Sequence, residues 1–384
     1  MAILGGIAAA LMIAFCAARG VLPLWQGQLG DFANYWLASR LILEGGDLSC
    51  LYDDAAFQAE LQGHGIEQLG KFSAFPPPTA LLLLPLAWLP VRISLWTWTA
   101  IKLGVLLPVH TEVLAKITGW TRAQALLLVL ASGNALAADF ALGQVYLLMS
   151  TLLLIGWHRR WGGWLGVAAV IKVFPAIFVL PWLADRRWRP VGMAALVGVA
   201  LMALSALVIG VDGVGVYLGG VLPGHLDGRL SMQPAESVAF QSIGAMLRSR
   251  LGDGLSFRVV HSVLVGALLL CGLAAWRGAA VLQGTDELRL GLVVFVGMAL
   301  APIGATYHML LTVLPLALLL CRLDRGRPLL LALWVAIGFL PYRVARELGE
   351  LWWPLAWPRL WLLWALALCV VALIQVDARG RVNP

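Results

Sequence analysis

Asp31 directly follows the first long apolar segment of this 384-residue sequence. If that segment crosses a membrane, the Asp31 carboxylate lies at the membrane surface, where a partly desolvated carboxylate can act as a general base. Asp31 also begins a stretch of apolar residues at helical spacing, and an aspartate at such a position commonly caps a helix with the same oxygen atoms. The spacing alone leaves both roles open.

Two more ionisable residues interrupt or follow apolar segments. Lys172 lies inside residues 161–184, which are otherwise apolar. A lysine at such a place is a functional candidate by default, although its flexible stem also allows the charge to reach the membrane surface. His308 follows Thr306-Tyr307 at the end of another span, where a ring N–H can donate to phosphate or sugar hydroxyls or serve structure alone.

Four polar side chains are candidate contacts for a sugar or a lipid headgroup: Asp139, Gln144, Gln241 and Ser242. Each of these side chains can instead form hydrogen bonds with backbone groups at a buried helix end. We find no Asp-x-Asp pair in a soluble segment and no glycine-rich phosphate loop, and the five cysteines have neither metal nor disulfide spacing. The sequence predicts no metal, no cofactor and no nucleotide-sugar site.

The composition places these residues in a membrane protein. Hydrophobic residues make up 61% of the chain and charged residues 12%, against about 25% charged in an average soluble domain. Apolar segments near the length that crosses a hydrocarbon core recur along the chain, and short basic clusters flank them. The net charge of +7 therefore indicates cytoplasmic anchors, and we expect no nucleic-acid partner.

We expect an all-α, polytopic fold with one domain over residues 1–384. The predicted spans are residues 3–22, 93–114, 123–140, 143–157, 191–210, 257–276, 288–304, 308–321, 328–342 and 358–375. Basic clusters flank residues 161–184 on both sides, so this stretch is predicted to enter and return around Lys172 to Pro175. The count is then about twelve crossings.

The positive-inside rule is obeyed if the N-terminus is cytoplasmic. Residues 23–92 and 211–256 then form the first and second large periplasmic loops. In the first loop, residues 31–43 are predicted to form an amphipathic helix on the outer leaflet, followed by a short helix from Asp53 to about Leu61. Residues 79–90 are predicted to be a juxtamembrane helix; if they crossed instead, the orientation downstream would have to be rebuilt.

Several strings in the chain resemble those of a known family. They are Asp31-Phe32-Ala33-Asn34-Tyr35-Trp36, Leu51-Tyr52-Asp53, Phe75-Pro76-Pro77-Pro78, Gly143-Gln144-Val145-Tyr146, Ile171-Lys172-Val173-Phe174-Pro175 and Phe240-Gln241-Ser242. In this order and spacing the chain resembles bacterial glycosyltransferase family 87, membrane mannosyltransferase-like enzymes of the C-type glycosyltransferase fold. One departure is Tyr146, which stands where the family usually has a polar asparagine.

The resemblance implies transfer of a sugar, most often mannose, from a polyprenyl-phosphate carrier to a lipid or glycan acceptor. The reaction would take place at the periplasmic face of the bacterial cytoplasmic membrane, with Asp31 as the base and Lys172 balancing the charge of the phosphate leaving group. The implied donor or acceptor contacts are Tyr35, Asp139, Gln144, Lys172, Gln241, Ser242 and His308. A single base without a second carboxylate nucleophile predicts inversion at the anomeric carbon.

A lipid or glycolipid transporter or flippase without transferase activity is the alternative, because Lys172 and the broken segment could form a central substrate site. Transporters of that kind usually contain internal repeats, and none is evident in this sequence.

Overall fold

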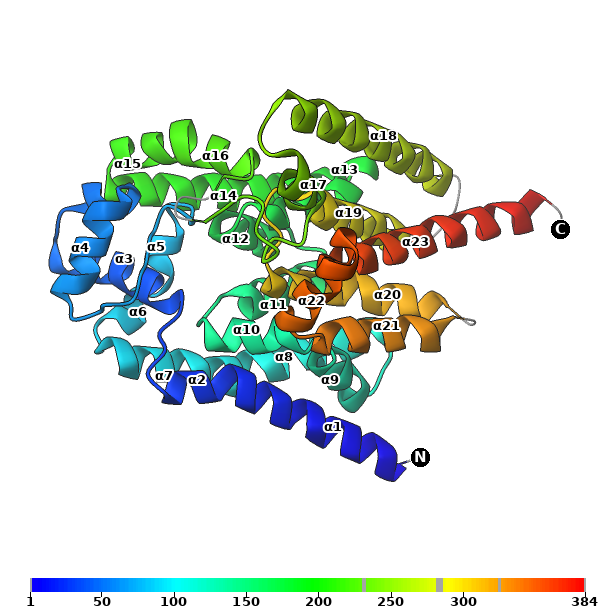
Figure 1. Cartoon of the computed structure of the whole chain (residues 1–384), viewed down its shortest axis with the longest axis horizontal. Helices are drawn as coiled ribbons and strands as arrows, with labels where there is room; N and C mark the ends of the chain where they lie inside the picture. The colour runs from blue at the N-terminus through cyan, green and yellow to red at the C-terminus, as the bar shows by residue number, and fades with distance from the viewer. Residues whose placement is uncertain (1, 230–232, 281–285, 324–325, 383–384) are drawn as a thin grey trace.

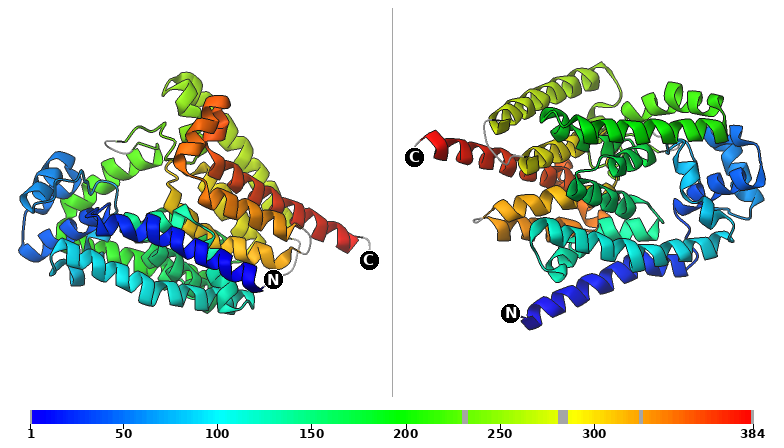
Figure 2. Two further views of the ribbon diagram at one scale, coloured as in Figure 1. Left: turned by 60° about the horizontal axis from the view of Figure 1, so that its bottom comes forward. Right: turned by 180° about the vertical axis from the view of Figure 1, so that it is seen from behind.

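The computed structural model describes residues 2–229, 233–280, 286–323 and 326–382. Within these ranges every regular element is a helix, which confirms the all-α prediction. The helices pack side by side along the long axis of the molecule, and the two chain ends project at the same end (Figure 1). The helices of the first loop lie at the opposite end, as the view from behind also shows (Figure 2).

Within the described ranges, four helical segments are long and apolar enough to cross a membrane: Gly6–Trp25, Trp188–Ile209, Leu255–Arg277 and Pro358–Gln375. Two bent helix pairs raise the number to six if each pair is one span; their bends are 77° and 102°. The protein is therefore a multi-pass membrane protein. The count of about twelve crossings is not confirmed, because other predicted spans are short helices, such as the 14 residues of α11 (Tyr146–Arg159).

Two of the predicted spans contain a π-helical turn. The first span runs through α1 (Ala2–Cys16), η1 (Ala17–Val21) and α2 (Leu22–Trp25). The second runs through α7 (Val91–Ile101), η3 (Lys102–Leu106) and α8 (Leu107–Thr118). Single π-turns inside helices are frequent at functional sites, and η3 begins at a buried lysine, Lys102.

The remaining helices of the bundle match some predicted spans, such as 191–210 and 257–276, but the predicted span 123–140 is divided into two helices with a 77° bend between them. These remaining helices are α9 (Arg122–Leu130), α10 (Asn134–Ala141), α12 (Gly163–Ile171), η4 (Phe174–Val179), α13 (Leu180–Ala184), α14 (Trp188–Ile209), α15 (Val211–Val216), η5 (Tyr217–Val221), α16 (Leu222–Leu226), α17 (Ile243–Leu251), α18 (Leu255–Ala280), α19 (Asp286–Leu300), η6 (Thr306–Thr312), α20 (Val313–Arg322), α21 (Arg327–Phe339), α22 (Tyr342–Leu351), η7 (Trp353–Ala356) and α23 (Pro358–Val382). The predicted break in residues 161–184 is confirmed, since Lys172 is extended (φ −148°, ψ 135°) between α12 and η4.

The first loop contains α3 (Phe32–Glu44), η2 (Leu48–Tyr52), α4 (Asp54–Gly63), α5 (Thr79–Leu82) and α6 (Leu84–Ala87). The prediction that residues 31–43 lie on the outer leaflet as an amphipathic helix is wrong for most of α3, because residues 32–39 are all buried. The short helices α5 and α6 pack against α3 and cover the face that was assigned to lipid.

Residues 79–90 form two short helices in place of the single predicted one. Pro85 lies in the first turn of α6, and proline has no backbone N–H with which to continue a helix. Neither four-residue helix is long enough to cross a membrane.

Candidate active site

A cavity of about 480 Å³ brings together four residues that the sequence singled out: Asp31, Gln144, Lys172 and His308. They come from four separate places in the chain. Asp31 precedes α3, Gln144 lies in the turn between α10 and α11, Lys172 lies between α12 and η4, and His308 belongs to η6. Residues from distant parts of the sequence thus line one space.

The Asp31 side chain does not cap α3. Asp31 occupies the N-cap position (φ −72°, ψ −10°), yet its carboxylate accepts no hydrogen bond from the first turn. The Gln144 side-chain amide donates to Asp31 Oδ2, and Oδ1 has no hydrogen-bond donor among the residues that the structure describes. The spacing left helix capping and general-base catalysis open. The structure shows no capping bond, so the carboxylate is available to the cavity.

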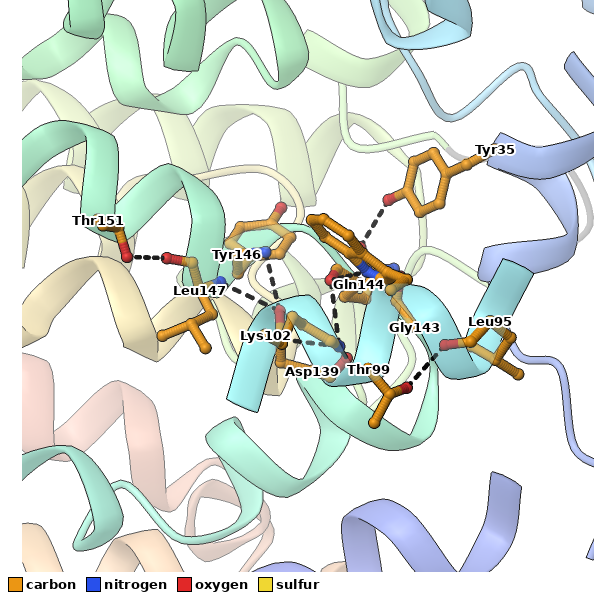
Figure 3. Close-up of polar contacts among 11 residues, drawn as sticks. Tyr35, Leu95, Thr99, Lys102, Asp139, Gly143, Gln144, Tyr146, Leu147 and Thr151 are labelled. Carbon is orange, nitrogen blue, oxygen red and sulfur yellow. Dashed lines mark hydrogen bonds and ion pairs between the residues drawn. The ribbon is translucent and has the colours of Figure 1, made fainter. Parts of the chain in front are cut away.

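Tyr35 holds Gln144 in place through a hydrogen bond. Its hydroxyl donates to Gln144 Oε1 at 2.7 Å (Figure 3), and both side chains are buried. This bond orients the amide so that its N–H₂ group faces Asp31. Tyr35 is not among the lining residues, so its contact with substrate is indirect in this geometry.

Two glycines allow α3 and the α10–α11 turn to meet. The backbone N–H of Phe32 donates to the carbonyl of Leu142 at 3.0 Å. A Cβ atom at Gly30 would lie 2.4 Å from Leu142 Cα, and one at Gly143 would lie 2.4 Å from Phe32 Cβ. Both glycines also have positive φ, +57° and +61°, which other residues rarely adopt.

Asp139 serves the scaffold beside this turn. Its Oδ1 accepts from the backbone N–H groups of Tyr146 (2.8 Å) and Leu147 (3.2 Å) at the start of α11. Its Oδ2 lies 3.2 Å from Lys102 Nζ, and both side chains are completely buried. Lys102 Nζ also donates to the Asp139 carbonyl at 2.7 Å (Figure 3). The pair ties η3 to the turn that carries Gln144.

Sequence reasoning missed Lys102, although a signal was present. A lysine near the middle of the predicted span 93–114 is costly in lipid, and it demands an internal partner. Asp139 lies in the next predicted span and is the acid nearest to Lys102 in the helices that follow.

Lys172 is the candidate cation for stabilising a leaving group. Its Nζ lies 3.8 Å from the centroid of the Phe75 ring, a cation–π contact. Burial lowers the pKa of Lys172 to about 7, and the Asp31 carboxylate opposes this shift. Burial likewise raises the pKa of Asp31, while Lys172, the Gln144 hydrogen bond and Lys71 act in the opposite direction.

His308 presents one ring nitrogen as a donor. Its Nδ1 accepts from the backbone N–H of Ala305 at 3.1 Å, so a neutral ring carries its proton on Nε2. The ring packs on Tyr146 with 4.5 Å between centroids. Tyr146, which replaces the polar residue usual in the family, thus supplies an aromatic wall of the cavity.

Lys71 also lines the cavity, and the sequence analysis did not single it out. Its backbone N–H donates to Asn34 Oδ1 at 3.1 Å, which fixes the Lys71 loop to the first turn of α3. Within the described part of the chain, the buried Lys71 Nζ has no hydrogen-bond partner. In the sequence Lys71 looked like an ordinary loop lysine, because nothing local showed that the loop folds back on α3.

Gln241 and Ser242 lie outside the lining of this cavity. The Gln241 amide donates to the carbonyls of Val238 (2.7 Å) and Ala356 (3.2 Å), and its Oε1 accepts from the Arg359 N–H. Ser242 Oγ caps α17 by accepting from Ala245 N–H. Their roles as substrate contacts stay predictions; in this structure Gln241 ties the second loop to η7 and α23, and Ser242 caps α17.

A polytopic, all-helical protein in which a desolvated carboxylate faces lysines across one cavity has the parts of a membrane enzyme for group transfer. The carboxylate can take a proton from a nucleophile, and the cations can balance charge on a leaving group. The profile of glycosyltransferase family 87 matches residues 74–302, more than half of the chain, and the chain belongs to this family. The protein is a membrane glycosyltransferase, and nothing in the comparisons favours a transporter.

Two curated relatives illustrate the family. A polyprenol-phosphate-mannose-dependent alpha-(1-2)-phosphatidylinositol mannoside mannosyltransferase of Mycobacterium tuberculosis is 26% identical over 339 residues, covering 79% of this chain and 77% of the relative. A polyprenol-phosphate-mannose-dependent alpha-(1-2)-phosphatidylinositol pentamannoside mannosyltransferase of Mycolicibacterium smegmatis is 27% identical over 307 residues, covering 74% and 72%. No solved structure matches this chain.

Proposed function

We propose that the protein transfers mannose from a polyprenyl-phosphate donor to a hydroxyl group of a glycolipid or glycan acceptor. The relatives named above use a polyprenol-phosphate-mannose donor and a phosphatidylinositol mannoside acceptor, which supports the donor class and a glycolipid acceptor. The observation that carries the proposal is the Asp31 carboxylate, held by Gln144 in the same cavity as Lys172.

In the proposed reaction, the acceptor hydroxyl gives its proton to Asp31 as its oxygen bonds to the anomeric carbon. The bond between that carbon and the phosphate oxygen breaks, and its electron pair leaves with the polyprenyl phosphate. Lys172 balances the charge that develops on the phosphate, and Lys71 and the His308 Nε2–H are further donors on the same cavity. Gln144 keeps Asp31 Oδ2 occupied, so Oδ1 receives the proton.

One displacement step with one base inverts the anomeric carbon, because the acceptor oxygen attacks opposite the leaving phosphate. NMR of the isolated glycoside, compared with the donor, gives the anomeric configuration. Retention would rule out direct displacement.

We further propose that the helices form a C-type glycosyltransferase fold with about twelve crossings and a cytoplasmic N-terminus. Both termini lie at one end of the molecule (Figure 1), which supports an even number of crossings. Residues 23–92 and 211–256 then form the periplasmic side of the single domain over residues 1–384, and the cavity faces the periplasm. Cysteine labelling from each side of oriented vesicles tests this orientation.

The decisive experiment compares wild type with Asp31→Asn, using synthetic polyprenyl-phosphate mannose and envelope glycolipids as acceptors. Asp53→Asn is the matched control, because Asp53 caps α4 outside the cavity and asparagine caps as well as aspartate. We expect transfer to fall by at least 100-fold in Asp31→Asn, since general-base catalysis contributes about 10²–10⁴-fold. Equal transfer by all three proteins would remove Asp31 from the mechanism.

A further inference from the structure

The short helix α16 forms part of the wall of the polar cavity and is only lightly packed. Its residues Leu222, His225 and Leu226 line the cavity, and all five residues of the helix are at least partly exposed. Among its helix contacts, those with η5, the segment that it continues, predominate. A helix with so few buried contacts needs a fixed point elsewhere if its side chains are to keep a defined position.

Arg248 of α17 provides a fixed point at the end of α16. Its Nη2 donates to the carbonyl of Asp227, the residue that follows the last turn of α16. Its Nε donates to Asp253 Oδ1 at 2.8 Å, and its Cζ lies 4.5 Å from the centroid of the Phe257 ring in α18. The Arg248 side chain is only 7% exposed. One buried cation thus joins the end of α16 to α17 and α18.

Gly228 allows the Arg248 guanidinium to reach the end of α16. Gly228 has a positive φ of +76°, and a Cβ at this position would lie 2.4 Å from Arg248 Nη1. Gly252 also has a positive φ, +62°, but a Cβ there would have no heavy atom of the described residues within 4 Å. The two glycines share the backbone constraint and differ in the contact with Arg248, so they form a matched pair for testing it.

His225 is the ionisable side chain that α16 brings to the cavity. Burial, Lys172 and Lys71 lower the pKa of His225 to about 4, so its ring is neutral near pH 7. A hydrogen bond to the Ser73 backbone opposes this shift. Because that bond favours the protonated ring, the ring N–H donates and the Ser73 carbonyl accepts. The second ring nitrogen of the neutral form is then a hydrogen-bond acceptor.

An acceptor at this place suits a sugar hydroxyl. Lys71 and Lys172 offer donors to the cavity, which suit a phosphate, whereas a hydroxyl group has a proton to donate. We propose that His225 accepts a hydrogen bond from a hydroxyl group of the transferred sugar, and that Arg248 positions His225 by fixing the end of α16. The inference rests on the proposed function, in which Lys172 lies beside the donor phosphate. His225 is then a specificity-determining residue, and Arg248 is a positioning residue.

The test of His225 compares polyprenyl-phosphate mannose with four donor analogues that lack the hydroxyl group at C2, C3, C4 or C6 of the sugar. His225→Ala should lower kcat/KM about ten-fold with mannose and leave it unchanged with one analogue, because that analogue has no hydroxyl for His225 to bind. His225→Gln should keep the preference for mannose, since its amide has both a donor for Ser73 and an acceptor. An equal loss with all five donors would overturn the hydroxyl contact.

Arg248 is tested through His225 in a double-mutant cycle. Arg248→Ala should weaken the preference for mannose over the same analogue, and in the His225→Ala background it should cause no further loss. The control is Arg250→Ala, because Arg250 is an exposed arginine of the same helix whose Cζ lies 5.7 Å from the centroid of the Trp353 ring. Losses that add in the double variant would overturn the positioning role.

The two glycines test the same contact without removing a buried cation. Gly228→Ala should displace the Arg248 guanidinium and weaken the preference for mannose as Arg248→Ala does. Gly252→Ala has the same backbone constraint and should keep the preference of wild type. An equal preference for mannose in both glycine variants would overturn the role of the Arg248 contact.

A further measurement does not depend on transfer. In a polyprenyl mannosyl phosphonate, a CH₂ group replaces the bridging oxygen, so the sugar cannot be transferred. Isothermal titration calorimetry should show about ten-fold weaker binding of this probe to His225→Ala than to wild type, and equal binding would overturn the contact. If wild type bound the probe more tightly than His225→Ala did, yet transferred mannose to no acceptor, the proposed function would fail while the sugar contact stood.

Discussion

The buried pair of Lys102 and Asp139 allows a test of how the general base is held in place. Lys102→Met keeps a stem of similar length but leaves the Asp139 carboxylate unpaired, and Asp139→Asn leaves the Lys102 ammonium unpaired. Removing one partner of a buried pair costs about 3–5 kcal/mol. The double variant buries neither charge, and an amide oxygen at position 139 can still accept from the N–H groups of Tyr146 and Leu147.

We therefore expect the double variant to be about 3 kcal/mol more stable than the sum of the single losses predicts. Equilibrium unfolding by denaturant in one fixed detergent gives the four free energies of the cycle. Losses that simply add would refute the view that Lys102 and Asp139 act as a unit.

The same variants should change catalysis through Gln144, whose carbonyl lies 3.5 Å from Lys102 Nζ. A hydrogen bond to a charged group contributes about 1.5–3 kcal/mol, so loosening the Gln144 contact should lower kcat/KM about 10- to 150-fold. The Gln144 hydrogen bond also lowers the pKa of Asp31, and its loss should move the acid limb of the kcat/KM profile to higher pH. Folded single variants with an unchanged acid limb would show that the pair does not position Asp31.

The remaining predictions concern the cavity itself. The pH profile of kcat/KM should be bell-shaped: it rises as Asp31 loses its proton, at a pKa that burial raises above its usual value, and falls as Lys172 loses its proton near pH 7. Lys172→Arg should keep the acid limb and remove the alkaline fall, because a guanidinium stays charged; an alkaline fall that persisted would assign it to another group. Tyr35→Phe should lower kcat about ten-fold with little change in KM, since the buried Gln144 Oε1 loses its donor. Steady-state kinetics, with the rate expressed per folded protein, measures this; a loss of activity that only matched the loss of folded protein would indicate a purely structural role. Gly143→Ala should reduce the yield of folded, active protein, because its Cβ would overlap Phe32; size-exclusion yield beside Gly104→Ala measures this.

The sequence predicted the cavity residues that lie next to helix ends. Asp31, Gln144, Lys172 and His308 each follow or interrupt an apolar segment, where a polar side chain stands out from its neighbours. The break at Lys172 was readable for the same reason, since a cation and Pro175 together oppose a continuous apolar helix. Long helices such as α14 and α18 matched their predicted spans closely.

The features that could not be predicted from the sequence depend on long-range contacts. Lys71 reaches the cavity in a loop that Asn34 and Gln58 hold, and α5 and α6 are the helices with the most contacts to the buried α3. Helical periodicity describes one element and contains no information about what covers its second face. The prediction of the number of crossings is limited for the same reason. A short helix that is surrounded by protein does not need the length of a helix that crosses lipid.

The position of the cavity follows from where the helices break. Between α10 and α11, and between α12 and η4, the backbone is irregular, and its N–H and C=O groups cannot be left facing lipid. Such breaks must be buried in the protein or line a cavity, and both of these breaks lie at the polar cavity, which Gln144 and Lys172 line. Asp31 joins them because the Phe32 N–H donates to the Leu142 carbonyl beside the first break, so a change at a break should cost more activity than the same change one turn inside a helix.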